Sequence, residues 1–513
     1  ASVAYDMKDD DEKTTRRKIR DLPYDIIPGD VATYRESVFL ERAIVEQRIR
    51  LAMGLPLQSV DKRESLTDGL ADASVAETYY EPPLINVIKF ACNACADNTY
   101  RVTDGCQGCL AHPCREICPK GAISFKDKKA YIDQEKCIHC GMCFNTCPYH
   151  AIQHQVRPCA DACGMHAIGS DDNGRAQIDY EKCVSCGQCL INCPFGAIAD
   201  KSQIFQVIQA INRGDEVIAA VAPAFVGQFG GKGNVDKLRQ ALTPLGMEEV
   251  AIGADLCTVQ EAEDFVEEVP EKIPFMGTSC CPAWSVMAKT EFPDHADCIS
   301  MALTPMTLTA RLIRKQHPEA KIVFVGPCSA KKLEAMRKSV RSEVDFVLTF
   351  EEMMGMMKAC GIDEYTKLEG EGSSDFGVAS ADGRGFAVAG GVASAVVNAI
   401  KRRYPDREVN VVNAEGLEEC RKMMKDAVKG KYPGYLIEGM ACPGGCVAGA
   451  GTLQAINRTA AAVKRYAKKS PRKNATENAY RMLIPALERD ADGKKMTGEQ
   501  ALAETIEAKR PKE

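Results

Sequence analysis

The cysteines restrict what this chain can fold into more than any other feature. Sixteen of the 25 cysteines lie between Cys92 and Cys193, and the other nine are spread over the rest of the 513 residues. In a reducing compartment, so many cysteines indicate metal binding rather than disulfides. The first residues lack the hydrophobic segment of a signal peptide, and no apolar run is long enough to cross a membrane. We therefore expect a cytoplasmic protein without membrane contact, whose cysteines bind metal.

Two runs of four cysteines share the spacing C-x2-C-x2-C-x3-C, and proline follows each run. They are Cys137, Cys140, Cys143 and Cys147, and Cys183, Cys186, Cys189 and Cys193. In bacterial ferredoxins this spacing lets three thiolates hold one 4Fe–4S cube while the fourth binds the other cube of a pair. A structural zinc site is the alternative, but it does not need the triple run and rarely has the trailing proline. The runs therefore predict iron–sulfur clusters.

Each run needs partner cysteines to complete its pair of cubes. The first pair would take Cys118, Cys137, Cys140 and Cys143, and Cys106, Cys109, Cys114 and Cys147. The second pair would take Cys92, Cys95, Cys159 and Cys193, and Cys163, Cys183, Cys186 and Cys189. All sixteen cysteines are then used in four cubes, with one ferredoxin unit inserted within the other. Because Cys92 and Cys95 come first in the sequence, we expect them at the outer end of this relay.

Composition divides the chain into four segments. These are a charged, helical extension (1–85), the ferredoxin-like domain (86–203), a segment of alternating strands and helices (204–455) and a helical extension (456–513). In the third segment a helix is expected at 203–216, followed by short buried strands at 217–224, 248–256, 272–279, 321–327, 344–350 and 434–441. The predicted fold class is therefore an α+β iron–sulfur part followed by an α/β catalytic domain.

The charge of the chain gives no reason to expect a nucleic-acid partner. The net charge is −6, and the basic residues are scattered except in the run at 464–473. We interpret that run as a solvated helix face rather than a binding patch.

Three of the expected strands run into cysteines. Cys280 and Cys281 follow the strand at 272–279, Cys328 follows the strand at 321–327, and Cys442 and Cys446 follow the strand at 434–441. The carboxyl ends of strands in α/β sheets line the crevice where ligands bind, so cysteines converging there predict a metal site. Neighbouring cysteines point in different directions and rarely bond each other, which predicts separate tasks for Cys280 and Cys281.

Three segments around these cysteines resemble the signature segments of the iron-only (FeFe) hydrogenases, in the same order. They are TSCCPAW at 278–284, PCSAKKLEA at 327–335 and EGMACPGGCVAGAG at 438–451. The resemblance covers residues 86–455, and the version of the motifs, together with the additional cysteines, resembles the second group (group B) of that family. It implies an active site in a crevice between two lobes of the α/β domain.

The resemblance also implies a cofactor, the H-cluster. This is a 4Fe–4S cube joined through one thiolate to a two-iron unit that carries carbon monoxide, cyanide and an azadithiolate bridge. Its ligands would be Cys281, Cys328, Cys442 and Cys446, the last as the bridging thiolate. Lys331 would donate a hydrogen bond to a cyanide, and Met440 would pack against the two-iron unit. The pocket walls would come from Ala222, Pro223, Ala224, Pro327 and the glycines of 389–394.

A proton route is implied as well. Cys280 would exchange protons with the bridge amine, since the ordinary thiol pKa of about 8.5 lies near neutrality. The onward route by resemblance is Glu261, Ser300 and then Asp264, with Glu263 as an alternative to Asp264. For these acids, an exposed charged helix face is the competing interpretation. The remaining cysteines, Cys257, Cys298, Cys360 and Cys420, belong to no motif and are expected in the core.

The resulting hypothesis is an enzyme that interconverts dihydrogen with protons and electrons. Electrons would come from a ferredoxin or flavodoxin, and maturation proteins would supply the cofactor. The alternatives are a hydrogen or redox sensor that keeps the cluster, and a cluster-carrying assembly protein without the two-iron unit. The chain departs from well-known relatives at Gly326, Ala224 and Met306, and such neighbours of a cofactor tune its properties.

Overall fold

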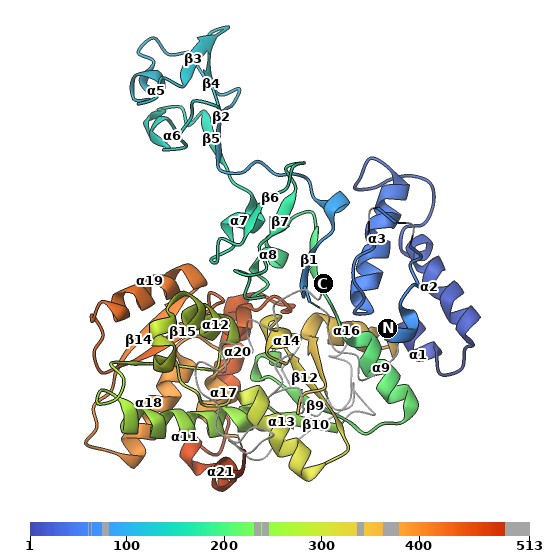
Figure 1. Cartoon of the computed structure of the whole chain (residues 1–513), viewed down its shortest axis with the longest axis vertical. Helices are drawn as coiled ribbons and strands as arrows, with labels where there is room; N and C mark the ends of the chain where they lie inside the picture. The colour runs from blue at the N-terminus through green and yellow to red at the C-terminus, as the bar shows by residue number, and fades with distance from the viewer. Residues whose placement is uncertain are drawn as a thin grey trace.

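The computed structural model describes most of the chain, in three stacked parts with a helical extension at one side (Figure 1). The described residues are 1–59, 61–62, 64–73, 82–229, 238, 246–335, 343–362 and 379–487. A small cysteine-rich module stands away from the rest, a second module lies below it, and a large α/β part forms the base. No helix among the described residues is long and apolar enough to cross a membrane.

Strand pairing shows two ferredoxin-like modules, one inserted in the other. In the inner module, β1 (Ile85–Val87) pairs antiparallel with β8 (Ile198–Asp200), and β6 (Ile168–Ser170) pairs with β7 (Ala176–Ile178). In the outer module, β2 (Thr99–Val102) pairs with β5 (Ile152–Gln155), and β3 (Ile123–Lys126) pairs with β4 (Lys129–Ile132). The predicted insertion is confirmed, and the segment 86–203 forms two modules rather than one domain.

Short helices complete the modules, and one arginine braces the junction between them. The outer module contains α5 (Pro113–Glu116) and α6 (Met142–Thr146), and the inner module contains α7 (Pro158–Asp161) and α8 (Gln188–Ile191). The buried guanidinium of Arg157 donates hydrogen bonds to the carbonyl oxygens of Cys95 (3.1 Å), Gly169 (2.8 Å) and Gly174 (2.9 Å). The point at which the chain returns from the outer module is therefore held by the inner one.

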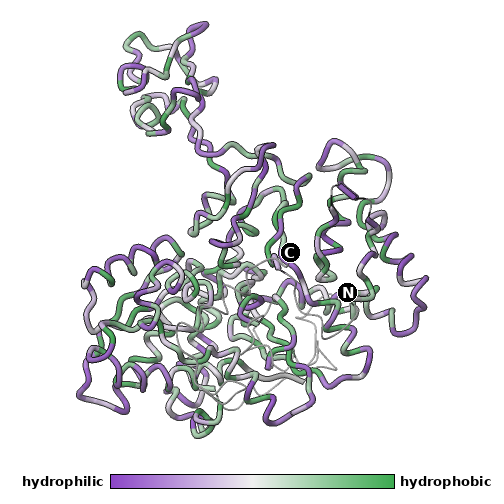
Figure 2. Tube along the Cα trace, viewed as in Figure 1, coloured by the Kyte–Doolittle hydropathy of each residue, from purple (hydrophilic) through white to green (hydrophobic). Residues whose placement is uncertain are grey.

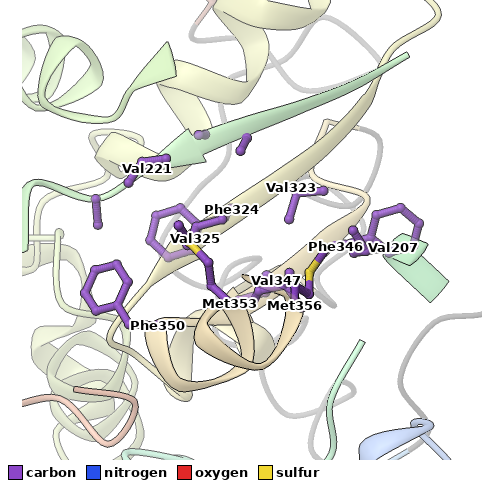
Figure 3. Close-up of a cluster of buried hydrophobic side chains, with 14 of the residues drawn as sticks. Val207, Val221, Val323, Phe324, Val325, Phe346, Val347, Phe350, Met353 and Met356 are labelled. Carbon is purple, nitrogen blue, oxygen red and sulfur yellow. The ribbon is translucent and has the colours of Figure 1, made fainter. Parts of the chain in front are cut away.

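The α/β part contains two parallel sheets. The larger has the order β10 (Gly246–Glu249), β9 (Val217–Val221), β12 (Lys321–Gly326), β13 (Phe346–Thr349). The smaller has the order β11 (Met276–Gly277), β15 (Tyr435–Met440), β14 (Asn410–Glu415). The apolar side chains of the larger sheet pack against α9 (Ile204–Arg213) and α16 (Phe350–Ala359), as Figure 3 shows for Phe324, Phe346 and Met353. Strands β9, β12 and β13 of the larger sheet are almost entirely apolar and buried, as buried parallel strands require.

Further helices surround the two sheets. They are α11 (Ala251–Glu268), α12 (Pro282–Glu291), α13 (Pro305–Gln316), α14 (Ala330–Ala335), α17 (Ala381–Gly385), α18 (Gly391–Arg403), α19 (Leu417–Val428), α20 (Ile456–Lys468) and α21 (Ile484–Leu487).

One strand prediction for this part was wrong, and one strand was not predicted. Residues 248–256 were expected as a strand, but only Glu248 and Glu249 lie in β10, and α11 begins at Ala251. The start of α11 is buried on all sides, so it has no polar face to reveal the helical period. The unpredicted strand is β14, whose residues are half-buried or exposed and include polar side chains, so the sequence there shows no buried apolar run.

The N-terminal extension packs against the α/β part. It contains α1 (Ser2–Asp6), α2 (Glu12–Ile26), α3 (Val38–Ala52) and α4 (Leu70–Ala73). Asp11 and Ser37 accept hydrogen bonds from backbone N–H groups at the starts of α2 and α3, as capping residues do. Gln206 of α9 donates to the carbonyl oxygen of Met53 (2.9 Å), and Asn212 donates to that of Ala4 (2.8 Å). The extension is therefore bound to the first helix after the modules.

The C-terminal extension is helical over α20 and α21, and residues 488–513 lie outside the described residues. In the basic run 464–473, Lys464, Arg465 and Lys468 are exposed, as a solvated face requires, while Tyr466 and Ser470 are buried.

A buried lysine joins the inner module to the α/β part. The ammonium of Lys332, on α14, donates to Asp200 of β8 (2.9 Å), to Glu352 of α16 (2.8 Å) and to the carbonyl oxygen of Lys201 (2.9 Å). The side chain of Lys332 is fully buried, while those of Asp200 and Glu352 are largely buried. The ammonium of Lys332 therefore connects α14, β8 and α16.

Replacing Lys332 by methionine should destabilise the protein, because it leaves two carboxylates without their shared cation. Removing one partner of a buried ion pair costs about 3 kcal/mol or more. We expect the midpoint of thermal unfolding to fall by several degrees. Lys182→Met, which removes an exposed pair with Asp179 (3.1 Å), is the control and should change stability by less than about 1 kcal/mol. Equal midpoints for Lys332→Met and the wild type would contradict the bracing role.

Candidate active site

A cavity of about 90 Å³ lies where strands of both sheets end. Strands β9 and β12 of the larger sheet and β11 and β15 of the smaller sheet run into the segments that line it. The four motif cysteines on its wall are Cys281, Cys328, Cys442 and Cys446. The other lining residues are mostly apolar, so the thiols and one lysine supply most of its chemical function.

Local backbone features fix the direction of these cysteines. Cys281 precedes the first residue of α12, Pro282, which suits this position because it lacks an N–H group. The indole N–H of Trp284 donates to the carbonyl oxygen of Thr278 (3.1 Å) and closes the turn. Between Cys442 and Cys446, Gly444 (φ 99°) and Gly445 (φ 85°) adopt left-handed backbone conformations that favour glycine.

The donor set fits an iron–sulfur group. Burial raises the pKa of Cys446 to about 12 and that of Cys328 to about 11, and nearby thiols act in the same direction. Four bare thiolates would therefore be costly here, whereas iron cations would compensate for their charge. Within the described residues, no three metal-binding side chains converge on one single-ion site. A cube does not require that geometry, because each cysteine binds a different iron.

Lys331 lines the same cavity and is held by a carboxylate that the sequence did not single out. Its ammonium lies 2.6 Å from Glu334 Oε2, one turn along α14, and both side chains are buried. The hydroxyl of Thr304 donates to Glu334 Oε1 at 2.5 Å. Burial lowers the pKa of Lys331, but the charge of Glu334 and its hydrogen bond raise it. The net effect is a pKa above the ordinary value. The lysine therefore presents a positive charge to the cavity.

Cys280 also lines the cavity and faces an acidic group in the core. Burial raises the pKa of its thiol, and the carboxyl group of Glu261 is the main electrostatic contributor in the same direction. Glu261 Oε1 accepts hydrogen bonds from the backbone N–H (2.7 Å) and hydroxyl (3.0 Å) of Ser279. Burial raises the pKa of Glu261 to about 7, and Asp264 adds to the shift. Ser279 was missed because its own motif drew attention only to the cysteines.

The other predicted relay residues lie outside the cavity wall. Ser300 is buried, and its hydroxyl accepts a hydrogen bond from the N–H of Ala302 (3.1 Å). Glu263, the alternative to Asp264, is partly exposed and forms an ion pair with Arg403 on α18. The structure therefore brings Cys280, Glu261 and Asp264 together and directs Glu263 elsewhere.

The predicted walls are largely present. Ala222, Pro223, Ala224, Pro327 and Met440 all line the cavity.

The glycines of 389–394 were expected on the wall, but this expectation was wrong. They are not among the lining residues, and the N–H of Gly390 instead donates to the buried carboxylate of Glu438 (2.8 Å). Gly445 and Gly449 line the cavity in their place.

The three positions at which the chain departs from well-known relatives, Gly326, Ala224 and Met306, lie in different places. Ala224 and Met306 line the cavity. Gly326 lies at the end of β12, where an added Cβ would come within 2.6 Å of the ring of Phe324. A larger side chain would therefore need Phe324 to move, which accounts for glycine at this position.

The cysteines of the two modules gather in four groups. In the outer module, Cys143 lies near Cys137, Cys118 and Cys140, which we name the Cys140 group, while Cys114 lies near Cys109 and Cys147. In the inner module, Cys159 lies near Cys193, Cys92 and Cys95, and Cys189 lies near Cys186, Cys183 and Cys163, which we name the Cys186 group. Three of the spacing-based ligand sets are matched in full by these neighbours, and the fourth is matched by Cys109, Cys114 and Cys147 without Cys106. Their binding of cubes stays a prediction.

Backbone N–H groups support these sulfurs. Ala122, Ala167 and Ala197 donate to the sulfurs of Cys118 (3.3 Å), Cys163 (3.4 Å) and Cys193 (3.4 Å), in each case four residues back. Donors aimed at sulfur favour the charged thiolate, which is the form that binds iron. The donor sets of the modules therefore also fit iron–sulfur clusters.

Two cysteine predictions need correction. Cys92 and Cys95 were expected at the outer end of the relay, but they belong to the inner module, because the outer module is inserted after them. Cys360 was expected in the core and is exposed. Cys257, Cys298 and Cys420 are buried as expected, and Cys257 lies near Glu261.

Comparison with known proteins supports the resemblance to the iron-only hydrogenases. The family model described as iron only hydrogenase large subunit, C-terminal domain, matches residues 215–450, and 4Fe-4S binding domains match 130–153 and 176–199. Iron hydrogenase 1 of Clostridium pasteurianum is 30% identical over 395 residues, which cover 66% of this chain and 68% of that protein. The chain belongs to the iron-only hydrogenase family.

Other similarities are more distant. The nuclear prelamin A recognition factor of Xenopus laevis is 25% identical over 321 residues, covering 50% of this chain and 70% of that protein. The apo [FeFe]-hydrogenase of Chlamydomonas reinhardtii is 22% identical, with a TM-score of 0.45, and the match covers 55% of this chain and 91% of that one.

Replacing Glu261 by glutamine should remove a pH dependence of stability. Burial raises the pKa of Glu261 from 4.5 to about 7, so between these values the folded protein keeps a proton that the unfolded chain releases. The stability of the wild type should therefore fall, relative to Glu261→Gln, as the pH rises through this window, by up to about 3 kcal/mol. Thermal unfolding of both proteins across the window measures this.

Glu263→Gln, at a partly exposed position, serves as the control for this measurement. Because Glu263 is paired with Arg403 at the surface, its replacement should leave the wild-type pH dependence in place. Identical pH dependence in the wild type and in Glu261→Gln would contradict the raised pKa of Glu261.

Proposed function

We propose that the protein interconverts dihydrogen with two protons and two electrons at an H-cluster bound in the crevice between the two lobes of the α/β part. The observation that carries the proposal is the convergence of four thiols, Cys280 and a charged lysine on one apolar cavity. The motif version favours the group B type. When bound, the cluster supplies the two-iron site at which the bond of dihydrogen is formed or broken.

The residues of the cavity would hold and orient this group. The ligands would be Cys281, Cys328, Cys442 and Cys446, with Cys446 as the bridging thiolate. Lys331, kept charged by Glu334, would donate a hydrogen bond to a cyanide. Met440 would pack against the two-iron unit, and the walls at Ala222, Pro223, Ala224 and Pro327 would exclude water.

Protons would enter and leave through Cys280. Its thiol would exchange a proton with Glu261, whose pKa of about 7 suits both uptake and release near neutrality. Ser279 holds Oε1 of Glu261, while Oε2 is buried with no hydrogen-bond partner among the described residues. That oxygen is therefore available to the thiol, and Ser300 and Asp264 would continue the route.

Electrons would pass through cubes held in the two modules. Cys186 of the inner module lines the same cavity as the motif cysteines, which makes the Cys186 group the last step before the active site. A ferredoxin or flavodoxin would deliver the electrons, and maturation proteins would supply the two-iron unit.

The alternatives account for fewer observations. A hydrogen or redox sensor needs no continuous relay of sixteen cysteines, and the family relative named above is a hydrogenase. A cluster carrier without the two-iron unit would need neither Lys331 nor Cys280, yet both line the cavity. The catalytic proposal therefore stands first.

Replacing Cys446 by serine should abolish loading of the two-iron unit, because a hydroxyl is a poor substitute for a thiolate on iron. Infrared bands of iron-bound carbon monoxide and cyanide, recorded after maturation, measure the loading. Cys360→Ser changes an exposed cysteine outside the motifs and should retain the bands. Wild-type bands in Cys446→Ser would remove Cys446 from the ligand set.

Replacing Cys280 by alanine should leave the cofactor in place but lower turnover by about 10²-fold or more, the low end for positioned proton transfer. Cys280→Asp should restore part of the rate, because a carboxyl group of similar reach can carry the proton. Infrared spectra and hydrogen evolution are measured on the same preparations. Wild-type turnover in Cys280→Ala would exclude Cys280 from the mechanism, and loss of the infrared bands would mean that it is a ligand.

A further inference from the structure

The two modules share one plan, so equivalent positions can be compared. The run Cys183–Cys193 of the inner module corresponds to Cys137–Cys147 of the outer module, and β1–β8 corresponds to β2–β5. Around the Cys186 group, the inner face consists of residues 163–166 and 184–188. Around the Cys140 group, the outer face consists of the equivalent residues 118–121 and 138–142.

The inner face is seated on the α/β part. An added Cβ on Gly187 would come within 2.5 Å of Ala450, and one on Gly164 within 2.8 Å of Leu417, so both backbones are in close contact with their neighbours. The side-chain amide of Gln188 donates to the sulfur of Cys442 (3.4 Å), and Val184 is buried. This contact brings Cys186 to the wall of the active-site cavity.

The outer face has a cysteine and a glycine at the positions of Cys186 and Gly187, and it is open. Ile138, which corresponds to Val184, is 53% exposed, and Met142, which corresponds to Gln188, is 39% exposed. Cys140, which corresponds to Cys186, is exposed, whereas the other outer-module cysteines are partly or fully buried. Figure 1 shows this module standing away from the rest, and Figure 2 shows hydrophobic segments in it despite that isolation.

The charges around this face favour an acidic occupant. Lys120 follows Cys118 on the outer face, is exposed, and lies in a module with seven lysines and arginines against five acidic residues. The whole chain, in contrast, carries −6. Apolar residues around an exposed thiolate, with Lys120 on the same face and an excess of basic residues in the module, suit a transient contact that is steered by opposite charge.

We propose that the outer face is the docking surface for a small, acidic one-electron carrier protein, seated as the α/β part is seated on the inner face. This inference rests on the proposed function. In the docked complex, the reduced carrier loses one electron and the cube of the Cys140 group gains it, with no bond made or broken. Two such transfers supply the two electrons that combine with two protons, and the reverse transfers return them.

The test uses the loaded full-length protein and a two-cluster bacterial ferredoxin as the carrier. The double variant Ile138→Asp/Met142→Asp places two acidic groups on the outer face. We expect the dissociation constant for oxidised ferredoxin to rise about tenfold or more, roughly 1.4 kcal/mol. The ratio of ferredoxin-driven to viologen-driven hydrogen evolution should fall by a similar factor, because viologen does not need a docking surface.

Leu110→Asp is the matched control, since Leu110 is the most exposed apolar side chain of the module (95%) and lies beside Cys109, outside the outer face. It should leave both the dissociation constant and the ratio at wild-type values. Lys120→Glu, which changes only an exposed side chain, should weaken ferredoxin binding at low salt and reduce its salt dependence. If the double variant loses iron, the test is made with Lys120→Glu instead.

Three results would overturn the proposal. One is unchanged ferredoxin binding in the double variant with full iron content, or in Lys120→Glu. Another is equal weakening by Leu110→Asp, which would indicate a general effect of charge on the module. The third is a wild-type dimer that the double variant dissociates, which would assign the face to a second copy. Absence of viologen-driven activity in the wild type would instead count against the proposed function.

Discussion

The site depends on four thiols that must reach one apolar cavity from three separate turns. Each turn follows a parallel strand, and strands of both sheets end at the cavity, so the relative position of the sheets sets the distances between the sulfurs. Within each turn, a local feature fixes the direction of the cysteine, such as Pro282 after Cys281 and the positive-φ glycines before Cys446. Burial then makes the free thiolates costly, which favours a cationic iron group over an empty cavity.

The same burial determines how the inner module must attach. Electron transfer to an enclosed group needs another carrier at its wall, and Cys186 occupies that position. The contact is made by small residues that allow close approach, while Lys332 fixes the module through Asp200. Packing and charge therefore act at different points of one interface. The outer module lacks such contacts within the described chain, so the proposed relay would separate electron entry at the outer module from electron delivery at the inner module.

The sequence predicted the parts of this molecule that follow short-range rules. Cysteine spacing was enough to predict the insertion of one module in the other, because the number of ligands in a cube is fixed. It was not enough to order the modules in space, so Cys92 was expected at the wrong end. The start of α11 was predicted as a strand because a helix buried on all sides shows no polar face. Glu334 and Ser279 were missed because their importance arises from contacts with Lys331 and Glu261 that only the folded chain makes.

Two doubled residues in the motifs illustrate how the chain serves both the cavity and its support. Cys281 lies among the motif thiols, while its neighbour Cys280 faces Glu261. On α14, Lys331 lines the cavity, and Lys332 is directed to Asp200 and Glu352. Adjacent residues of a helix or turn point in different directions. Two identical residues in succession therefore face different surroundings. Lys331 is paired with Glu334 on its own helix, whereas Lys332 is paired with Asp200 and Glu352 on other elements. The locations of these carboxylates distinguish the lysine that lines the cavity from the lysine that joins separate elements.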